Sequence, residues 1–194
     1  FYVASAAAVI LGLYSFTMPA CPPKGTSGSK SWFSMLGLDA FALFRKGKMA
    51  VFFLFAMLLG ASLQLTNAYG DTFLQDFGKI DSFKDLLTVK YPAIIMSISQ
   101  ISETVFILFI PFFMKRFGIK NVMLMSMFSW VLRFGLFAFG DPGAGLWMIV
   151  ISNIVYGMAF DFFNVSGSLF VEHESDAAIR GSVQGLFMMM VNGF

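Results

Sequence analysis

Six apolar runs constrain the fold of this chain more than any other feature of its sequence. They occupy residues 1–18, 49–69, 91–114, 121–140, 145–171 and 182–194, and most of the charged residues lie in the segments between them. A bilayer core about 30 Å thick needs roughly 20 predominantly apolar residues for each helical span. Because a helix satisfies its own backbone hydrogen bonds in lipid, the sequence predicts an all-α protein that crosses a membrane several times. Both end runs are cut short, so we expect the chain to be part of a longer protein.

The scarcity of charge supports lipid as the solvent. Only 12% of the residues are charged and 58% are hydrophobic, whereas soluble domains carry about 25% charge. The net charge of +2 is too small to indicate a nucleic-acid-binding surface. Cys21 and His173 are each the only residue of their type, which excludes an internal disulfide and leaves no metal-ligand or nucleophile–base motif. We therefore expect neither an enzyme nor a metal centre.

The basic residues predict how the runs are oriented. Nine Lys and Arg residues fall in segments 20–48, 115–120 and 172–181, and three fall in segment 70–90. Because cytoplasmic loops carry the excess of Lys and Arg, the first three segments are predicted to be cytoplasmic. Within the first of them, residues 39–45 begin with an acid and end with a base, as expected of a short helix lying at the membrane interface.

Two apolar runs contain polar pairs that are expensive to place in lipid. Gln64 and Asn67 are three residues apart, and Gln100 and Glu103 repeat this spacing, so each pair shares a helix face. A carboxylate at the bilayer centre costs about 2.5–3.5 kcal/mol on insertion scales and persists mainly where it is paired or used. Carboxamides both donate and accept hydrogen bonds, which suits a nucleobase edge or sugar hydroxyls.

The fifth run adds two aromatic rings and a second acid, Tyr156, Phe160 and Asp161. The rings would supply a flat apolar wall, and a desolvated carboxyl readily takes up a proton. The alternatives are interhelical hydrogen bonding for the amides and an internal ion pair for the acids, for example with Arg133. Together, two amide-containing pairs and two acids favour a site for a neutral, planar solute and a proton.

Four stretches make a more specific comparison possible. Residues 36–44, 95–104, 156–168 and 178–180 closely resemble the nucleoside:proton symporter family, the bacterial nucleoside permease branch of the major facilitator superfamily. The similarity extends from about residue 32 to residue 194. It implies the C-terminal six-helix bundle, in part, of a twelve-helix transporter in the bacterial inner membrane.

The resemblance also implies a domain organisation. Residues 1–19 would be the end of transmembrane helix 6, and residues 20–47 a cytoplasmic linker with an interfacial helix. Residues 48–194 would then form transmembrane helices 7 to 10 and the start of 11. The partners implied are a nucleoside, the lipid bilayer and the N-terminal bundle of the same protein, without nucleic acid.

The family assigns roles to the polar residues that match its motifs. Asp161 falls on an acidic position and, with Glu103, is expected to couple the proton. Arg116, Gly118 and Lys120 resemble the cytoplasmic loop motif that holds the two bundles together. The substrate-binding positions that this sequence matches are Gln64, Asn67, Gln100, Glu103, Tyr156 and Phe160.

The resulting functional hypothesis is symport of nucleosides with protons by alternating access. The coupling ion is H+, and no other cofactor is expected. A proton-coupled permease for a sugar or another small polar solute is the alternative on the same fold. A channel is disfavoured because the turns are short and no segment resembles a re-entrant filter.

Overall fold

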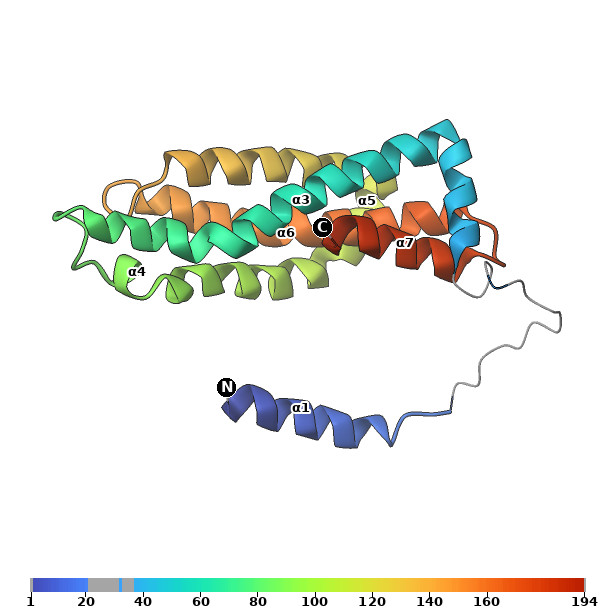
Figure 1. The fold of residues 1–194 in the computed structure, drawn as a ribbon, viewed down its shortest axis with the longest axis horizontal. Helices are drawn as coiled ribbons and strands as arrows, with labels where there is room; N and C mark the ends of the chain where they lie inside the picture. The colour runs from blue at the N-terminus through green and yellow to red at the C-terminus, as the bar shows by residue number, and fades with distance from the viewer. Residues whose placement is uncertain (1, 21–31, 33–36, 194) are drawn as a thin grey trace. The chain divides into compact units, whose positions relative to one another are not determined.

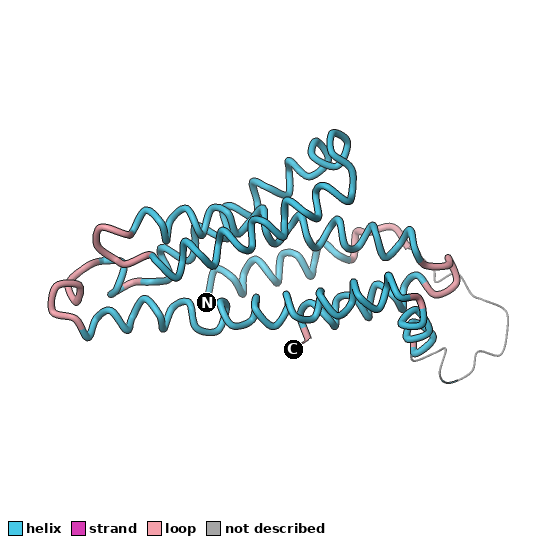
Figure 2. The backbone as a smooth tube through the Cα atoms, turned by 90° about the horizontal axis from the view of Figure 1, so that it is seen from above, coloured by secondary structure: helices cyan, strands magenta, loops and turns pink. Residues whose placement is uncertain are grey.

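The computed structural model describes residues 2–20, 32 and 37–193. Helices make up most of this part of the chain, and it contains no strand (Figure 2). The predicted all-α fold is therefore confirmed. The chain divides into two compact units, Phe1–Ser31 and Trp32–Phe194. The Pro/Gly/Ser-rich part of the predicted linker, residues 21–31, and residues 33–36 lie outside the described residues.

The first unit contains one helix, α1, Tyr2–Ser15. Its uncharged, apolar sequence fits the predicted end of a membrane span. The second unit contains the other helices (Figure 1), whose bounds are η1 Leu38–Arg45, α3 Gly47–Asp76, η2 Phe77–Lys79, α4 Leu87–Lys90, α5 Pro92–Phe139, α6 Leu146–Glu174 and α7 Arg180–Asn192.

Three stretches of helix in the described residues are long and apolar enough to cross a membrane, Gly47–Lys79, Pro92–Phe139 and Leu146–Glu174. The chain is thus a multi-pass helical membrane protein. α3 is longer than its apolar run, which we expected to end near Tyr69, and it continues to Asp76. Gly70 lies within this helix and is buried, and an added Cβ there would lie 2.7 Å from the methyl carbon of Met96.

α5 contains two of the predicted spans joined at a single residue. Gly118 has φ 74° and ψ 167°, so the helix is interrupted there and the two halves are separate spans. This φ lies in a region that glycine reaches without steric cost. The tight turn expected at residues 116–120 is therefore present, in its shortest form. The next turn is held by Asp141, whose carboxylate accepts hydrogen bonds from the amides of Gly143 at 2.7 Å and Gly145 at 3.1 Å.

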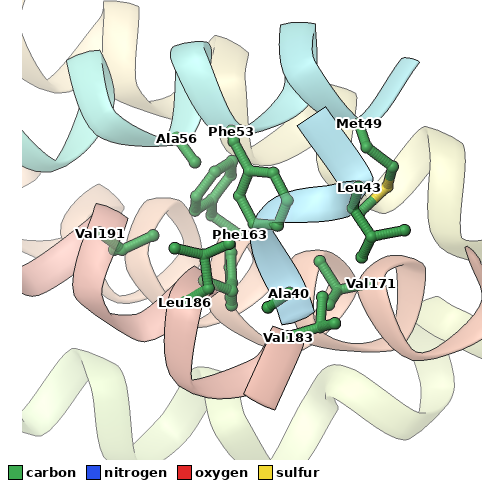
Figure 3. Packing of buried hydrophobic residues seen from close by; sticks show 11 residues of the cluster. Ala40, Leu43, Met49, Phe53, Ala56, Phe163, Val171, Val183, Leu186 and Val191 are labelled. Carbon is green, nitrogen blue, oxygen red and sulfur yellow. The ribbon is translucent and has the colours of Figure 1, made fainter. Parts of the chain in front are cut away.

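α6 is the central helix of the second unit, with buried residues along its whole length. At one end, its Phe163 and Val171 pack with Phe53 of α3 and Val183 of α7 (Figure 3). η1 also contributes buried side chains to this cluster. The helix predicted at residues 39–45 is therefore present, as a 3₁₀ helix packed on the bundle, and its position at the membrane interface stays a prediction.

Small residues let α6 approach the first half of α5 closely. A Cβ added at Gly157 would lie only 2.5 Å from the carbonyl carbon of Ser102 and 2.6 Å from the amide nitrogen of Glu103. The Ser102 hydroxyl also donates a hydrogen bond to the Ile154 carbonyl across this crossing. Close backbone approach through small residues is typical of helix packing in membranes. The crossing fixes Glu103 beside the middle of α6.

Candidate functional site

A polar pocket of about 410 Å³ lies between α3, both halves of α5, and α6. It unites three of the predicted substrate-binding residues, each on a different element: Asn67 on α3, Gln100 on α5 and Tyr156 on α6. Its lining residues are Asn67, Asp71, Ala93, Met96, Ser97, Ser99, Gln100, Arg133 and Tyr156. A larger groove of about 460 Å³ between α3, α5 and α6 is almost entirely apolar and contains none of the predicted substrate-binding residues.

Glu103 does not itself line this pocket but neighbours two residues that do, Gln100 and Tyr156. The side-chain amide of Gln100 reaches its carboxylate at 3.5 Å, so the two residues share a face as their spacing predicts. The Tyr156 hydroxyl lies beside Glu103 and also beside Asn67. An amide, a carboxylate and a phenol therefore converge from three helices, which offers a solute both donors and acceptors.

Aromatic rings form the apolar side of the site. Tyr156 stacks on Phe160, with ring centroids 5.6 Å apart and an interplanar angle of 15°. Trp130, on the second half of α5, meets Tyr156 edge to face at 5.8 Å. The sequence hypothesis included Tyr156 and Phe160 but not Trp130, because an isolated Trp in an apolar run carries no signal of which neighbour it meets.

The surroundings of Arg133 differ most from those that the sequence suggests. It was considered only as an ion-pair partner for an acid, and the ion pairs found among the described residues do not include it. Instead its guanidinium lies 4.2 Å from the Tyr156 ring centroid and donates to the Ser152 carbonyl at 3.3 Å. It is 1% exposed and forms part of the pocket wall.

Gln64 lies apart from this pocket. Its side-chain amide donates to the Asn192 carbonyl at 3.3 Å, which ties α3 to α7. Packing of this kind is the alternative that the sequence left open for each amide. Its place among the substrate-binding residues stays a prediction.

Asp161 is buried, and one of its carboxylate oxygens has no hydrogen-bond partner. Among the described residues, Glu103 is close enough for its charge to act on Asp161. An unpaired buried carboxylate is costly, so this residue is a strong candidate for carrying a proton. It does not line the pocket that contains Gln100 and Tyr156.

The remaining predicted residues lie at the junction within α5. Arg116, Gly118 and Lys120 are all exposed, at the turn between its two halves. The side chains of Arg116 and Lys120 are available to another part of the protein, and the role of the three residues in holding two bundles together stays a prediction. In the described part of the chain, no group of three or more His, Cys, Asp and Glu residues is arranged to hold a metal ion.

Comparison with known proteins links these features to one family. A family model described as "Nucleoside H+ symporter" matches residues 1–194, so the similarity also covers the first 31 residues. Xanthosine permease from Escherichia coli (strain K12) is 58% identical over 193 residues, or 99% of this chain and 46% of the relative. Nucleoside permease NupG from the same organism is 56% identical over 194 residues, or 100% of this chain and 46% of the relative.

Solved structures give the same result. Two crystal structures of nucleoside transporter NupG match with TM-scores of 0.77 and 0.83, at 56% and 55% identity, the second being that of a point mutant. Each match covers 99% of this chain and 48% of the solved chain. The chain thus spans about half the length of the relatives it matches, and these relatives are transporters rather than enzymes. The chain belongs to the nucleoside H+ symporter family.

Proposed function

We propose that this chain supplies the C-terminal half of a nucleoside site in a transporter that couples uptake to protons. The observation that carries the proposal is that Gln100 and Tyr156, which line one polar pocket, both lie beside Glu103. A nucleoside is neutral, with a planar base and a hydroxylated sugar. Amides suit the base edge, a carboxylate suits ribose hydroxyls, and aromatic rings suit the base face.

In this proposal each side chain has a separate task. Asn67 and Gln100 orient the base, Glu103 accepts from ribose hydroxyls or the base, and Tyr156 and Phe160 pack against it. Gln64 joins these substrate-binding residues when its hydrogen bond to the Asn192 carbonyl of α7 is broken. An N-terminal bundle of the same protein supplies the other half of the site. The two bundles move so that the site opens in turn to one side and the other of the bacterial inner membrane. Arg116, Gly118 and Lys120 stabilise one of the two arrangements.

Substrate class and coupling are tested together with the full-length protein in proteoliposomes. We expect an inward proton gradient to drive accumulation of radiolabelled uridine and a protonophore to abolish it. Unlabelled adenosine and inosine should compete, whereas free ribose and hexoses should not. Competition by a hexose but not by nucleosides would instead support a sugar permease, and uptake indifferent to the protonophore would exclude proton coupling.

We propose that Asp161 is the main carrier of the coupled proton, because Glu103 also binds the substrate. Asp161→Asn should therefore remove uptake against a gradient while leaving uridine binding and uridine–uridine exchange close to the wild-type level. Proteoliposomes that compare gradient-driven uptake with exchange provide the measurement. If the variant still accumulates uridine, the coupled proton is carried elsewhere, and Glu103→Gln in the same assay identifies whether Glu103 carries it.

A further inference from the structure

Arg133 is a buried cation that the proposed transport mechanism leaves unused. Its side chain is 1% exposed and it is the largest fully buried residue among those described. Burying a guanidinium without a paired carboxylate is expensive, and an ionisable residue within a membrane span is by default a functional one. No direct ion pair in the described ranges includes it, although the charge of Glu103 acts on it from a longer distance. Its short-range contacts are therefore with other groups.

Two anchors hold the Arg133 residue on α6. Its Nη1 donates to the main-chain carbonyl of Ser152 at 3.3 Å, and the Ser152 hydroxyl donates back to the main-chain carbonyl of Arg133 at 3.0 Å. Its Nε has no hydrogen-bond partner. Side chain and backbone are thus both tied to α6, one helical turn before Tyr156.

The face of Tyr156 is the main surface that the guanidinium contacts. The separation of 4.2 Å from the ring centroid is well within the range of a cation–π interaction, which strengthens where water is excluded. The Phe137 ring is more distant, at 6.0 Å. With Trp130 at its edge and Phe160 stacked on it, the Tyr156 ring is held on several sides. Its hydroxyl is therefore aimed in one direction, beside Asn67 and Glu103.

We propose that Arg133 is a positioning residue of the substrate pocket, which acts by fixing the ring of Tyr156 so that its hydroxyl faces Asn67 and Glu103. This inference rests on the proposed function for its consequence, since a well-placed hydroxyl strengthens substrate binding. The contact itself is a property of the protein and is testable without substrate. Arg133 need not touch the nucleoside.

The transport test uses full-length protein with Arg133→Met, which keeps a long side chain and removes the charge. The KM for uridine should rise about tenfold, as expected for loss of a desolvated cation–π contact, while the maximal rate per transporter changes by less than about twofold. Arg133→Lys keeps a cation but not the planar group, so it should restore part of the affinity.

Ser126→Ala is the matched control. Ser126 is also buried on the second half of α5, and its hydroxyl donates to the Ala159 carbonyl of α6 at 2.6 Å. This change loosens the same pair of helices without touching Tyr156. If Arg133 served packing alone, Arg133→Met and Ser126→Ala would both lower the melting temperature and neither would raise KM. That result would overturn the inference.

A spectroscopic test separates this inference from the proposed function. Full-length protein labelled with 3-fluorotyrosine gives a ¹⁹F resonance for Tyr156, assigned by its loss in Tyr156→Phe. Arg133→Met should shift this resonance, and Ser126→Ala should leave it in place. An unchanged resonance in Arg133→Met overturns the positioning role, whether or not uridine is transported. A shifted resonance in a protein that transports no nucleoside supports the positioning role while the proposed function fails.

Discussion

Replacing Glu103 with alanine is expected to reduce uridine uptake by the full-length protein by more than about tenfold, because a hydrogen bond to a charged group contributes about 1.5–3 kcal/mol. The Glu103 carboxylate receives the Gln100 amide at 3.5 Å and lies beside the Tyr156 hydroxyl. Its removal takes away a charged acceptor beside the pocket, and the Gln100 amide and the Tyr156 hydroxyl both lose this neighbour. Initial rates of uptake in whole cells, normalised to transporter in the membrane, provide the measurement.

Two further variants distinguish what the carboxylate does. Glu103→Gln keeps the size of the side chain and removes its charge, so retained uptake would show that hydrogen bonding alone is sufficient. Gln100→Ala should weaken uptake less than Glu103→Ala, since a neutral amide contributes less. Asp81→Ala is the control, because this carboxylate is 97% exposed and its ion pair with Lys84 at 2.9 Å is a surface contact. If Gln100→Ala and Glu103→Ala both leave uptake intact, the proposed site is wrong.

The membrane spans could be predicted from the sequence because a helix that lies in lipid must consist mainly of apolar residues. Each apolar run has a helix or half-helix in the structure, and the charged segments mark where the runs are separated. The ends of the helices were predicted less accurately. α3 passes Tyr69 because nothing after it breaks the helix until η2 begins at Phe77. The junction at Gly118 is shorter than a five-residue turn because one glycine with φ 74° reverses the chain.

For the site, sequence spacing could predict only which polar residues share a face of one helix. Gln100 and Glu103 lie on one face because residues three apart are neighbours on a helix surface. Which face turns towards the pocket depends on neighbouring helices, and sequence spacing does not contain this information. Gln64 therefore meets Asn192 of α7, although it has the same spacing from Asn67.

The contact partners of Arg133 also could not be predicted from the sequence. An arginine in an apolar run suggests a carboxylate partner, since an ion pair is the usual compensation for buried charge. The structure places the face of Tyr156 and a backbone carbonyl around it instead. Both partners lie on α6, so the contact follows from the packing of α5 on α6 and not from local sequence.

The second large effect is expected at that helix crossing. Gly157→Ala should destabilise the protein by about 1–3 kcal/mol, the usual cost of overpacking. The added methyl group would lie 2.5 Å from the Ser102 carbonyl carbon and 2.6 Å from the Glu103 amide nitrogen, and backbone cannot rotate away as a side chain can. Gly157→Leu should prevent folding. Thermal unfolding of the purified full-length protein, with membrane yield for the leucine variant, provides the measurement.

Gly135→Ala separates this packing effect from the effect of losing a helical glycine. Gly135 lies in the second half of α5, and an added Cβ there has no neighbour within 4 Å. Alanine is favoured over glycine in a helix interior by about 1 kcal/mol, so this control should be neutral or slightly stabilising. Because α6 can accommodate a methyl group at the crossing only by moving away from Glu103, Gly157→Ala should also raise the KM for uridine. A variant with wild-type stability and KM would mean that α5 and α6 do not cross this closely.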